Sequence, residues 1–414
     1  MRQIAIDILM KYKQENSYLN IELNHVLNKH ELSKEDKDLI TRIVYGTVQN
    51  EIYLDYQLAP YIKTKIKKYD HMVLLMSLYQ LIFLTKIPDY AIINEAVNLV
   101  KHKGGKYRSQ VVNAILRNFL RQGCIDIEGT EEEKLSISTS TPLWLVKMLI
   151  KQLGKETTQK VLASYHEVPT LAARVNTLKT SRDEILKNYD VQVGYLSQDA
   201  ILFKSGNIAN TDLFKQGLVS VQDESSQMVA LLLNPAKHSR VLDMCSAPGS
   251  KTTHLSAIME NTGMIEAIDL YEHKIQLIQN NAKRLNATNI HAQAYDSTKL
   301  TDLFEKESFD SILLDGPCSG LGVIRRKPEI KYLPSTNMDE IIVLQRKLLE
   351  NAYLLLKKGG HLVYSTCTIN KKENQLQVID FIKHHQDMKV VEERLVLPFE
   401  YHSDGFYMCK MKKE

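Results

Sequence analysis

Two cysteines occupy positions in this sequence where a thiol could do chemistry. Cys318 lies in "DGPCSG" and Cys367 lies in "YSTCT", and each follows a hydrophobic segment that is typical of a β-strand. Four interpretations are open at this point: a disulfide, a metal site, packing in a core, or a reaction that needs a thiolate. If the two strands are neighbours in a parallel sheet, both thiols face the same pocket.

The cysteine content argues against a disulfide framework and against a metal site. The chain has five cysteines, an odd number, and its charged first segment is not typical of a signal peptide, so we expect no disulfide. No two cysteines have Cys-x-x-Cys spacing and no nearby histidine completes a zinc-binding set, so we also expect no metal. For Cys124 and Cys409 we predict packing in a core.

The segment that carries both motifs alternates between strand-like and helix-like patterns. Six of its segments are rich in apolar and β-branched residues, and helical patterns separate most of them. This alternation predicts a domain with a parallel α/β sheet over residues 216–414. The predicted strands span 240–244, 264–269, 290–294, 309–315, 360–366 and 405–411.

A ligand site is predicted beyond the carboxyl ends of these strands, where open parallel sheets bind their ligands. The first strand runs into "CSAPGSK" (245–251), a turn of small residues that lets a ligand approach the backbone. Its single glycine does not support a dinucleotide site. Four aspartates end or follow successive strands, namely Asp243, Asp269, Asp296 and Asp315. Carboxylates there suit a ligand with a ribose, an amino group and no phosphate, and S-adenosylmethionine meets that description.

Thiols beside this cofactor indicate which kind of atom is methylated. An exocyclic amine needs no thiol, because its own lone pair can attack the methyl group. Carbon 5 of a pyrimidine is barely nucleophilic, but a thiolate that adds to carbon 6 makes the ring an enamine-like species that can attack. Cationic neighbours must favour the thiolate, and the candidates are Lys251, Arg325, Arg326 and Lys327. We therefore predict that the two thiols serve one covalent cycle.

The rest of the chain is predicted to form two further domains. Residues 1–125 carry apolar residues at helical spacing and indicate an all-α bundle, in which a helix could begin at Pro88 and could end at 103–105. The acidic stretch 126–136 marks a boundary. Residues 126–215 then mix strand-like segments (171–179 and 200–206) with helices, one of which opens with a capping box at Ser181 and Glu184. This pattern predicts a small α+β domain.

Charge is distributed unevenly along the chain. Residues 1–125 contain 18 Lys and Arg against 12 Asp and Glu, a net charge of +6, whereas the whole chain carries +4. Basic residues gather in 101–123, which fits contact with a polyanion and equally fits a solvated helix face. The most apolar run, 72–84, is too short for a membrane span, so we expect a cytoplasmic protein with no membrane partner.

Three motifs together resemble those of a known family. "DMCSAPGSKTTHL", "DGPCSGLGVIRRKPEIK" and "YSTCT" are similar to the motifs of the Sun-type RNA cytosine-5 methyltransferases, and the resemblance covers nearly all 414 residues. It implies a NusB-like helical RNA-binding domain, a small linker domain and a Rossmann-like class I methyltransferase domain. The usual "CAAPGGK" of the family is "CSAPGSK" here, and Ser250 would matter only if its position required a positive φ angle.

The resemblance also implies a role for each site residue. Cys367 matches the nucleophile, and Cys318 matches the thiol that assists breakdown of the covalent adduct. Asp315 matches a residue near the methyl group that could hydrogen-bond the N3/N4 edge of the base. The implied contacts with S-adenosylmethionine are Cys245, Ser246, Ala247, Pro248, Gly249, Ser250, Lys251, Asp269, Asp296 and Asp315.

The activity implied by the resemblance is methylation of carbon 5 of a cytosine in small-subunit (16S) ribosomal RNA. The NusB-like first domain favours ribosomal RNA over transfer RNA, which is the closest alternative. A non-catalytic NusB-like RNA-binding factor is the alternative from another class, and the intact thiols and strand-end carboxylates weigh against it. We expect a monomer that binds S-adenosylmethionine and the RNA.

Overall fold

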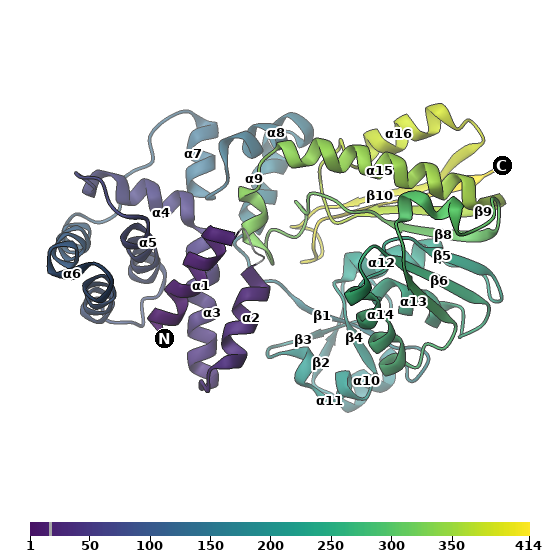
Figure 1. The fold of residues 1–414 in the computed structure, drawn as a ribbon, viewed down its shortest axis with the longest axis horizontal. Helices are drawn as coiled ribbons and strands as arrows, with labels where there is room; N and C mark the ends of the chain where they lie inside the picture. Colours follow the sequence, from purple (N-terminus) through teal and green to yellow (C-terminus); the bar gives the residue numbers. More distant parts are fainter. Residues whose placement is uncertain (16–18) are drawn as a thin grey trace. The chain divides into compact units, whose positions relative to one another are not determined.

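The computed structural model describes residues 1–15 and 19–414, which form two compact units. The first unit comprises Met1–His166 together with Lys327–Tyr332, and the second comprises Glu167–Arg326 and Leu333–Glu414 (Figure 1). The boundaries at 126 and 216 that the sequence suggests do not coincide with this division, and the three-domain organisation stays a prediction.

The first unit is helical, as the spacing of its apolar residues predicts. Residues 72–80 are buried without interruption in α5, so the most apolar run of the chain is a central helix of the core. Among the described residues no helix is both long and apolar enough to cross a membrane. The elements are α1 (Arg2–Glu15), α2 (Leu19–Lys29), α3 (Lys34–Gln49), α4 (Glu51–Leu58), η1 (Ala59–Tyr61), α5 (Lys68–Phe83), α6 (Asp89–Gln122), α7 (Glu131–Ser138), α8 (Leu143–Leu153), α9 (Lys155–Ser164) and η4 (Pro328–Tyr332).

The segment labelled α6 contains two helices that meet at a kink. The first begins after Pro88 and ends at 103–105, as predicted, because Gly105 has φ of 79° and interrupts the helical geometry there. The second continues to Gln122. Lys101, Lys103 and Lys106 are exposed around this kink.

A short segment from late in the chain completes the helical unit. The Lys331 Nζ donates a hydrogen bond of 2.7 Å to the Gln49 carbonyl, and the Tyr332 hydroxyl donates one of 2.8 Å to the Val48 carbonyl. Lys331 is fully buried, and this burial lowers its pKa to about 7. Turn η4 is therefore part of the helical core rather than a surface loop.

The second unit begins with a small antiparallel sheet whose strand order is β2-β3-β1-β4. The predicted strands at 171–179 and 200–206 are present but shorter, and the capping box at Ser181 and Glu184 is confirmed. The elements are β1 (Leu171–Val175), α10 (Arg182–Asn188), β2 (Val191–Val193), β3 (Ala200–Phe203), η2 (Ile208–Asn210), α11 (Asp212–Lys215) and β4 (Val219–Val221).

A seven-stranded sheet follows, with the order β10-β11-β9-β8-β5-β6-β7. Strands β5 to β9 run parallel to one another, and β11 lies antiparallel between β9 and β10. The elements are α12 (Glu224–Leu233), β5 (Arg240–Asp243), α13 (Ser250–Ile258), β6 (Met264–Asp269), α14 (Glu272–Leu285), β7 (Ile290–Ala294), η3 (Ser297–Asp302), β8 (Phe309–Asp315), α15 (Thr336–Leu355), β9 (Leu356–Thr366), α16 (Gln375–His384), β10 (Met388–Val396) and β11 (Phe406–Lys413).

All six strands predicted for this sheet are present, whereas β10 was not predicted. Residues 389–393 of β10 are exposed and include two glutamates, so they lack the apolar alternation of a half-buried strand. Charged, exposed residues are common on edge strands because they discourage pairing with another chain.

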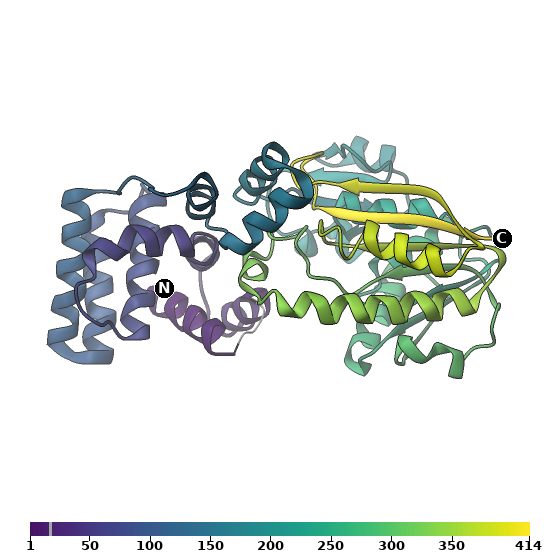
Figure 2. The same ribbon diagram turned by 90° about the horizontal axis from the view of Figure 1, so that it is seen from above.

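Helices cover both faces of the large sheet. Ile312 and Leu314 of β8 pack in the cluster that contains α15 and α16, while Leu313 packs on the other face with α12 and α13. This is the alternation expected for a strand buried on both sides. In Figure 2, α15 (green) and α16 (yellow) lie beside one another along the sheet.

The two cysteines that were predicted to pack in a core differ in their burial. Cys409 is fully buried in β11, as predicted. Cys124 is exposed, so the prediction for it is wrong. It follows the end of α6 in an irregular segment, 123–128, where no apolar periodicity directs its side chain inward.

Candidate active site

The structure brings Cys318 and Cys367 together. Strands β8 and β9 are parallel neighbours in which Asp315 pairs with Ser365, and the two cysteines lie just beyond these residues. Their Sγ atoms are 3.1 Å apart. The assumption that the two strands are adjacent is therefore correct, and both thiols lie at one edge of the sheet.

The surroundings of the two thiols differ. The hydrogen bond with Cys367 and burial raise the pKa of Cys318 well above its ordinary value, and the negative charges of Cys367 and Glu373 act in the same direction. Cys318 therefore keeps its proton to a higher pH than an ordinary cysteine does.

Lys251 provides positive charge at this edge of the sheet. Its Nζ lies 2.7 Å from Asp315 Oδ2, and Asp315 Oδ1 accepts a hydrogen bond of 2.8 Å from Ser365. Burial alone would lower the pKa of Lys251, but attraction to Asp315 and to a Cys367 thiolate raises it above its ordinary value. Lys251 is thus a cation that favours the ionised form of Cys367.

The two arginines considered as further thiolate partners have other roles. Arg326 binds Asp404 and Asp223 through contacts of 2.7 Å each, and Arg325 donates to the Ser403 carbonyl at 2.8 Å. Their guanidinium groups hold the chain near 403–404 in place. Of these three cations, Lys251 is therefore retained as a partner of the thiolate, and the two arginines are not.

The predicted cofactor loop, 245–251, forms a tight turn between β5 and α13. The Ser246 backbone N–H and hydroxyl both donate to the Ile268 carbonyl at 2.9 Å, and the Gly249 N–H donates to the Ser246 carbonyl at 2.7 Å. The positive φ angle of 96° falls on Gly249, where a Cβ would lie 3.1 Å from Ile278 Cα. Ser250 begins the helix α13, so the replacement of the family's second glycine causes no strain.

Arg174 stabilises this loop from strand β1. It lies fully buried in β1 and donates to the Ser250 carbonyl, to Thr253 Oγ1 at 3.2 Å and to Gln222 Oε1 at 2.7 Å. Burial lowers its pKa to about 9. The sequence offered one signal for such a role, namely an arginine inside the apolar strand "LAARV" that needs buried acceptors.

The strand-end carboxylates have distinct environments. Asp243 is buried, which raises its pKa to about 7, and its Oδ1 accepts no hydrogen bond from the described residues. Asp269 accepts the Ala247 N–H at 3.3 Å and pairs with Lys274 at 3.2 Å. Asp296 caps η3 through hydrogen bonds of 2.9 and 2.7 Å from Thr298, which lower its pKa. Asp296 therefore has a structural role whether or not it also contacts a ligand.

In comparisons with known proteins, three segments of the chain match family models. A family model described as 16S rRNA methyltransferase RsmB/F matches residues 230–412, a NusB family model matches 1–121, and a ferredoxin-like domain model of the RsmF/B type matches 141–205. "Probable ribosomal RNA small subunit methyltransferase B" of Bacillus subtilis is 40% identical over 100% of this chain and 99% of that protein. The chain belongs to this methyltransferase family. The Shewanella oneidensis protein named ribosomal RNA small subunit methyltransferase B is 33% identical over the same shares of the two chains.

Solved structures support the fold of this methyltransferase. The crystal structure of PH0851 is similar with a TM-score of 0.84 and 23% identity, over 99% of this chain and 97% of that one. That of NSun6 from Pyrococcus horikoshii with SFG has a TM-score of 0.60 and 23% identity, over 64% and 97% of the two chains. The predicted fold is confirmed: a NusB-like helical part, a ferredoxin-like part and a Rossmann-like methyltransferase part.

Methyltransferases of this kind use S-adenosylmethionine, and the residues of the predicted crevice fit it. The left-handed Gly249 leaves the loop without a side chain where a ligand would approach, and Asp243 Oδ1 is a buried acceptor with no donor among the described residues. Both features suit a cationic, hydroxyl-bearing ligand without phosphate. When bound, the cofactor supplies an electrophilic methyl group.

Substitution of Asp269 is expected to weaken cofactor binding. Asp269→Ala removes a carboxylate that would accept hydrogen bonds from two hydroxyl groups of the ligand. Such a loss lowers the affinity for the ligand roughly tenfold or more. Isothermal titration of S-adenosylmethionine into Asp269→Ala should show this loss, whereas Asp302→Ala, an exposed aspartate in the same unit, should bind as the wild type does. Equal affinity of the two variants would remove Asp269 from the site.

Proposed function

We propose that the protein methylates carbon 5 of a cytosine in small-subunit ribosomal RNA through a covalent bond between Cys367 and carbon 6 of the base. The observation that carries the proposal is the 3.1 Å approach of two thiols at the ends of adjacent parallel strands. Methylation of an exocyclic amine would need neither thiol, whereas carbon-5 methylation needs a nucleophile and a base in turn.

The proposed cycle uses the two thiols in order. The Cys367 thiolate adds to carbon 6, and the electron pair of the carbon 5–carbon 6 double bond becomes available at carbon 5. Carbon 5 then takes the methyl group, and the bonding electrons of the cleaved bond remain on the sulfur of S-adenosylhomocysteine. Cys318 gives its own proton to water, and the resulting thiolate removes the proton from carbon 5, so that the double bond re-forms and Cys367 leaves as a thiolate. Atoms and charge balance, because one proton is released for each methyl group transferred.

The electrostatics of the pair support this order of roles. Lys251 stabilises negative charge on Cys367, which suits a nucleophile that must be ionised first. The raised pKa of Cys318 suits a strong base, because a thiolate with a high proton affinity takes a carbon-bound proton more readily. Asp315, which contacts Lys251 and Ser365, could also accept a hydrogen bond from the N4 amino group of the base.

The choice of ribosomal RNA rests on the relatives and on charge. The curated relatives carry names that specify the ribosomal small subunit, and the NusB family model covers the basic part of the chain. Exposed lysines on α6 could neutralise phosphates, which would make RNA affinity fall with salt. The target cytosine would leave its stack to reach the thiols, which is easiest in an RNA loop.

The test is transfer of labelled methyl groups to unmodified small-subunit RNA, followed by mapping of the labelled base. We expect the label on carbon 5 of one cytosine. Label on transfer RNA alone would keep the mechanism and overturn the substrate. Cofactor binding without label on any RNA would favour the non-catalytic RNA-binding factor instead.

A further inference from the structure

One buried carboxylate outside the predicted site joins the two segments that carry the thiols. Glu373 is fully buried, and it accepts hydrogen bonds from the Ser319 N–H at 2.8 Å and the Ser319 hydroxyl at 2.6 Å. Ser319 directly follows Cys318. Asn370, in the turn after Cys367, donates to the same carboxylate at 2.8 Å. Glu373 thus bridges the turn after one thiol and the turn after the other.

Further bonds make this junction rigid. The hydroxyls of Ser319 and Thr368 are 2.8 Å apart, and Thr368 directly follows Cys367. Gln345 of α15 donates to the Pro317 carbonyl at 2.8 Å and to Glu373 at 3.5 Å. The residues on both sides of Cys318 are therefore fixed from Glu373 and from α15.

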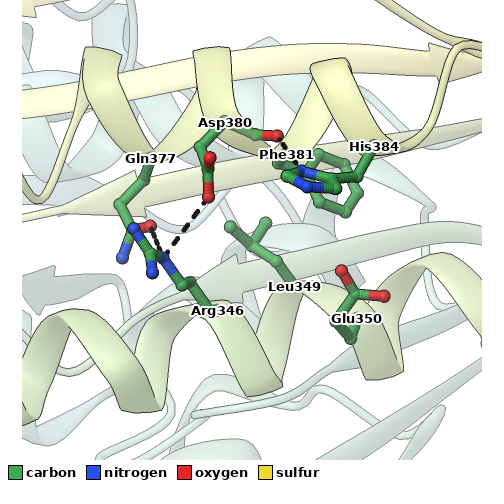
Figure 3. A pocket seen from close by; sticks show the side chains of 7 residues that line it. All are labelled: Arg346, Leu349, Glu350, Gln377, Asp380, Phe381 and His384. Carbon is green, nitrogen blue, oxygen red and sulfur yellow. Dashed lines mark hydrogen bonds and ion pairs between the residues drawn. The ribbon is translucent and has the colours of Figure 1, made fainter.

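The support extends to the surface of α15 and α16. Gln345 accepts a hydrogen bond of 3.1 Å from Gln377, which lines a pocket of about 210 Å³ between these helices (Figure 3). Arg346, which also lines this pocket, donates a hydrogen bond of 3.4 Å to Gln377 Oε1 and pairs with Asp380 at 3.4 Å (Figure 3). The thiol turn is thus supported by a buried polar network that begins outside the reaction centre.

The chemistry of Glu373 is unusual for a purely structural group. All four of its hydrogen bonds come from neutral donors of the described chain, and no cation contributes. Burial of a carboxylate without a paired cation is unfavourable in free energy, which indicates a functional role for Glu373. Its negative charge is also one of the causes that raise the pKa of Cys318.

We infer that Glu373 is a positioning residue that keeps the Cys318 turn in register with the Cys367 turn. The inference rests on the proposed function, since it assigns Glu373 to the step in which the covalent adduct is released. Glu373 acts through its hydrogen bonds with Ser319 and through its charge.

Glu373→Gln tests the inference, because it keeps the shape of the side chain and removes the charge. We expect kcat to fall roughly tenfold through misplacement of the release base while KM for RNA stays unchanged, and the RNA-linked fraction of protein to rise. Without the charge the pKa of Cys318 falls, so the release rate measured in single turnover should reach its plateau at lower pH. The matched control is Glu224→Gln: Glu224 is an equally buried carboxylate that accepts three backbone N–H groups, at 2.7 to 3.0 Å.

The outcomes separate the inference from the proposed function. A wild-type adduct fraction and an unshifted pH profile in Glu373→Gln would overturn the inference alone. If that variant does not fold, Ser319→Ala removes one hydroxyl from the junction, and it must then raise the adduct fraction for the inference to stand. Absence of carbon-5 methylation by the wild-type protein would overturn the proposed function and the inference together.

Discussion

Cys367→Ala is expected to abolish methyl transfer while cofactor binding persists. The variant lacks the sulfur that would add to carbon 6, so carbon 5 stays too weak a nucleophile, and the rate should fall roughly a thousandfold or more. Lys251 cannot substitute, because its Nζ is held by Asp315 at 2.7 Å. The measurement is incorporation of labelled methyl groups into small-subunit RNA.

Cys124→Ala is the control for the loss of a thiol. Cys124 is exposed and belongs to the helical unit, so its removal should leave incorporation unchanged. If Cys367→Ala kept substantial activity and Cys318→Ala were inactive, the roles proposed for the two thiols would have to be exchanged. If both variants were active, covalent catalysis would be excluded altogether.

Cys318→Ala is expected to trap the protein on its RNA. Addition to carbon 6 and methyl transfer need only Cys367, but removal of the carbon-5 proton loses its base, so the adduct persists. A denaturing gel should show a protein band shifted by the RNA, in an amount that approaches that of the enzyme, and multiple turnover should stop. The Cys318→Ala, Cys367→Ala double variant should give no such band.

A different pattern would contradict the order of the thiols. If Cys318→Ala lost activity without a shifted band, Cys318 would act before or during the covalent step rather than after it. The distance of 3.1 Å between the two sulfurs makes the expected order feasible, since one bound base could contact both.

Local sequence patterns predicted the elements of the catalytic sheet and the two thiols well. Strand periodicity, the small-residue turn at 245–251 and the capping box at Ser181 are each encoded within a few residues, and all are present. The edge strand β10 was not predicted, because its exposed residues lack the alternation of apolar and polar side chains that is typical of a strand.

Contacts between distant residues were not predictable in this way. Glu373 binds Ser319 across 54 positions and Arg174 reaches Ser250 across 76, and no local pattern indicates either pairing. Each is a buried charge whose partner is decided by how strands and turns meet in three dimensions. A charged residue in an otherwise apolar or tightly turned segment is the one hint the sequence offers.

The helical unit has a consequence for the order in which the chain can fold. Its core includes η4, whose Lys331 and Tyr332 bond the carbonyls at the end of α3. During synthesis the first 166 residues emerge early, but these bonds cannot form until residue 332 of 414 has been made. The helical unit can therefore complete its core only after strands β5 to β8 have been made, which ties its maturation to production of the segment that carries Cys318.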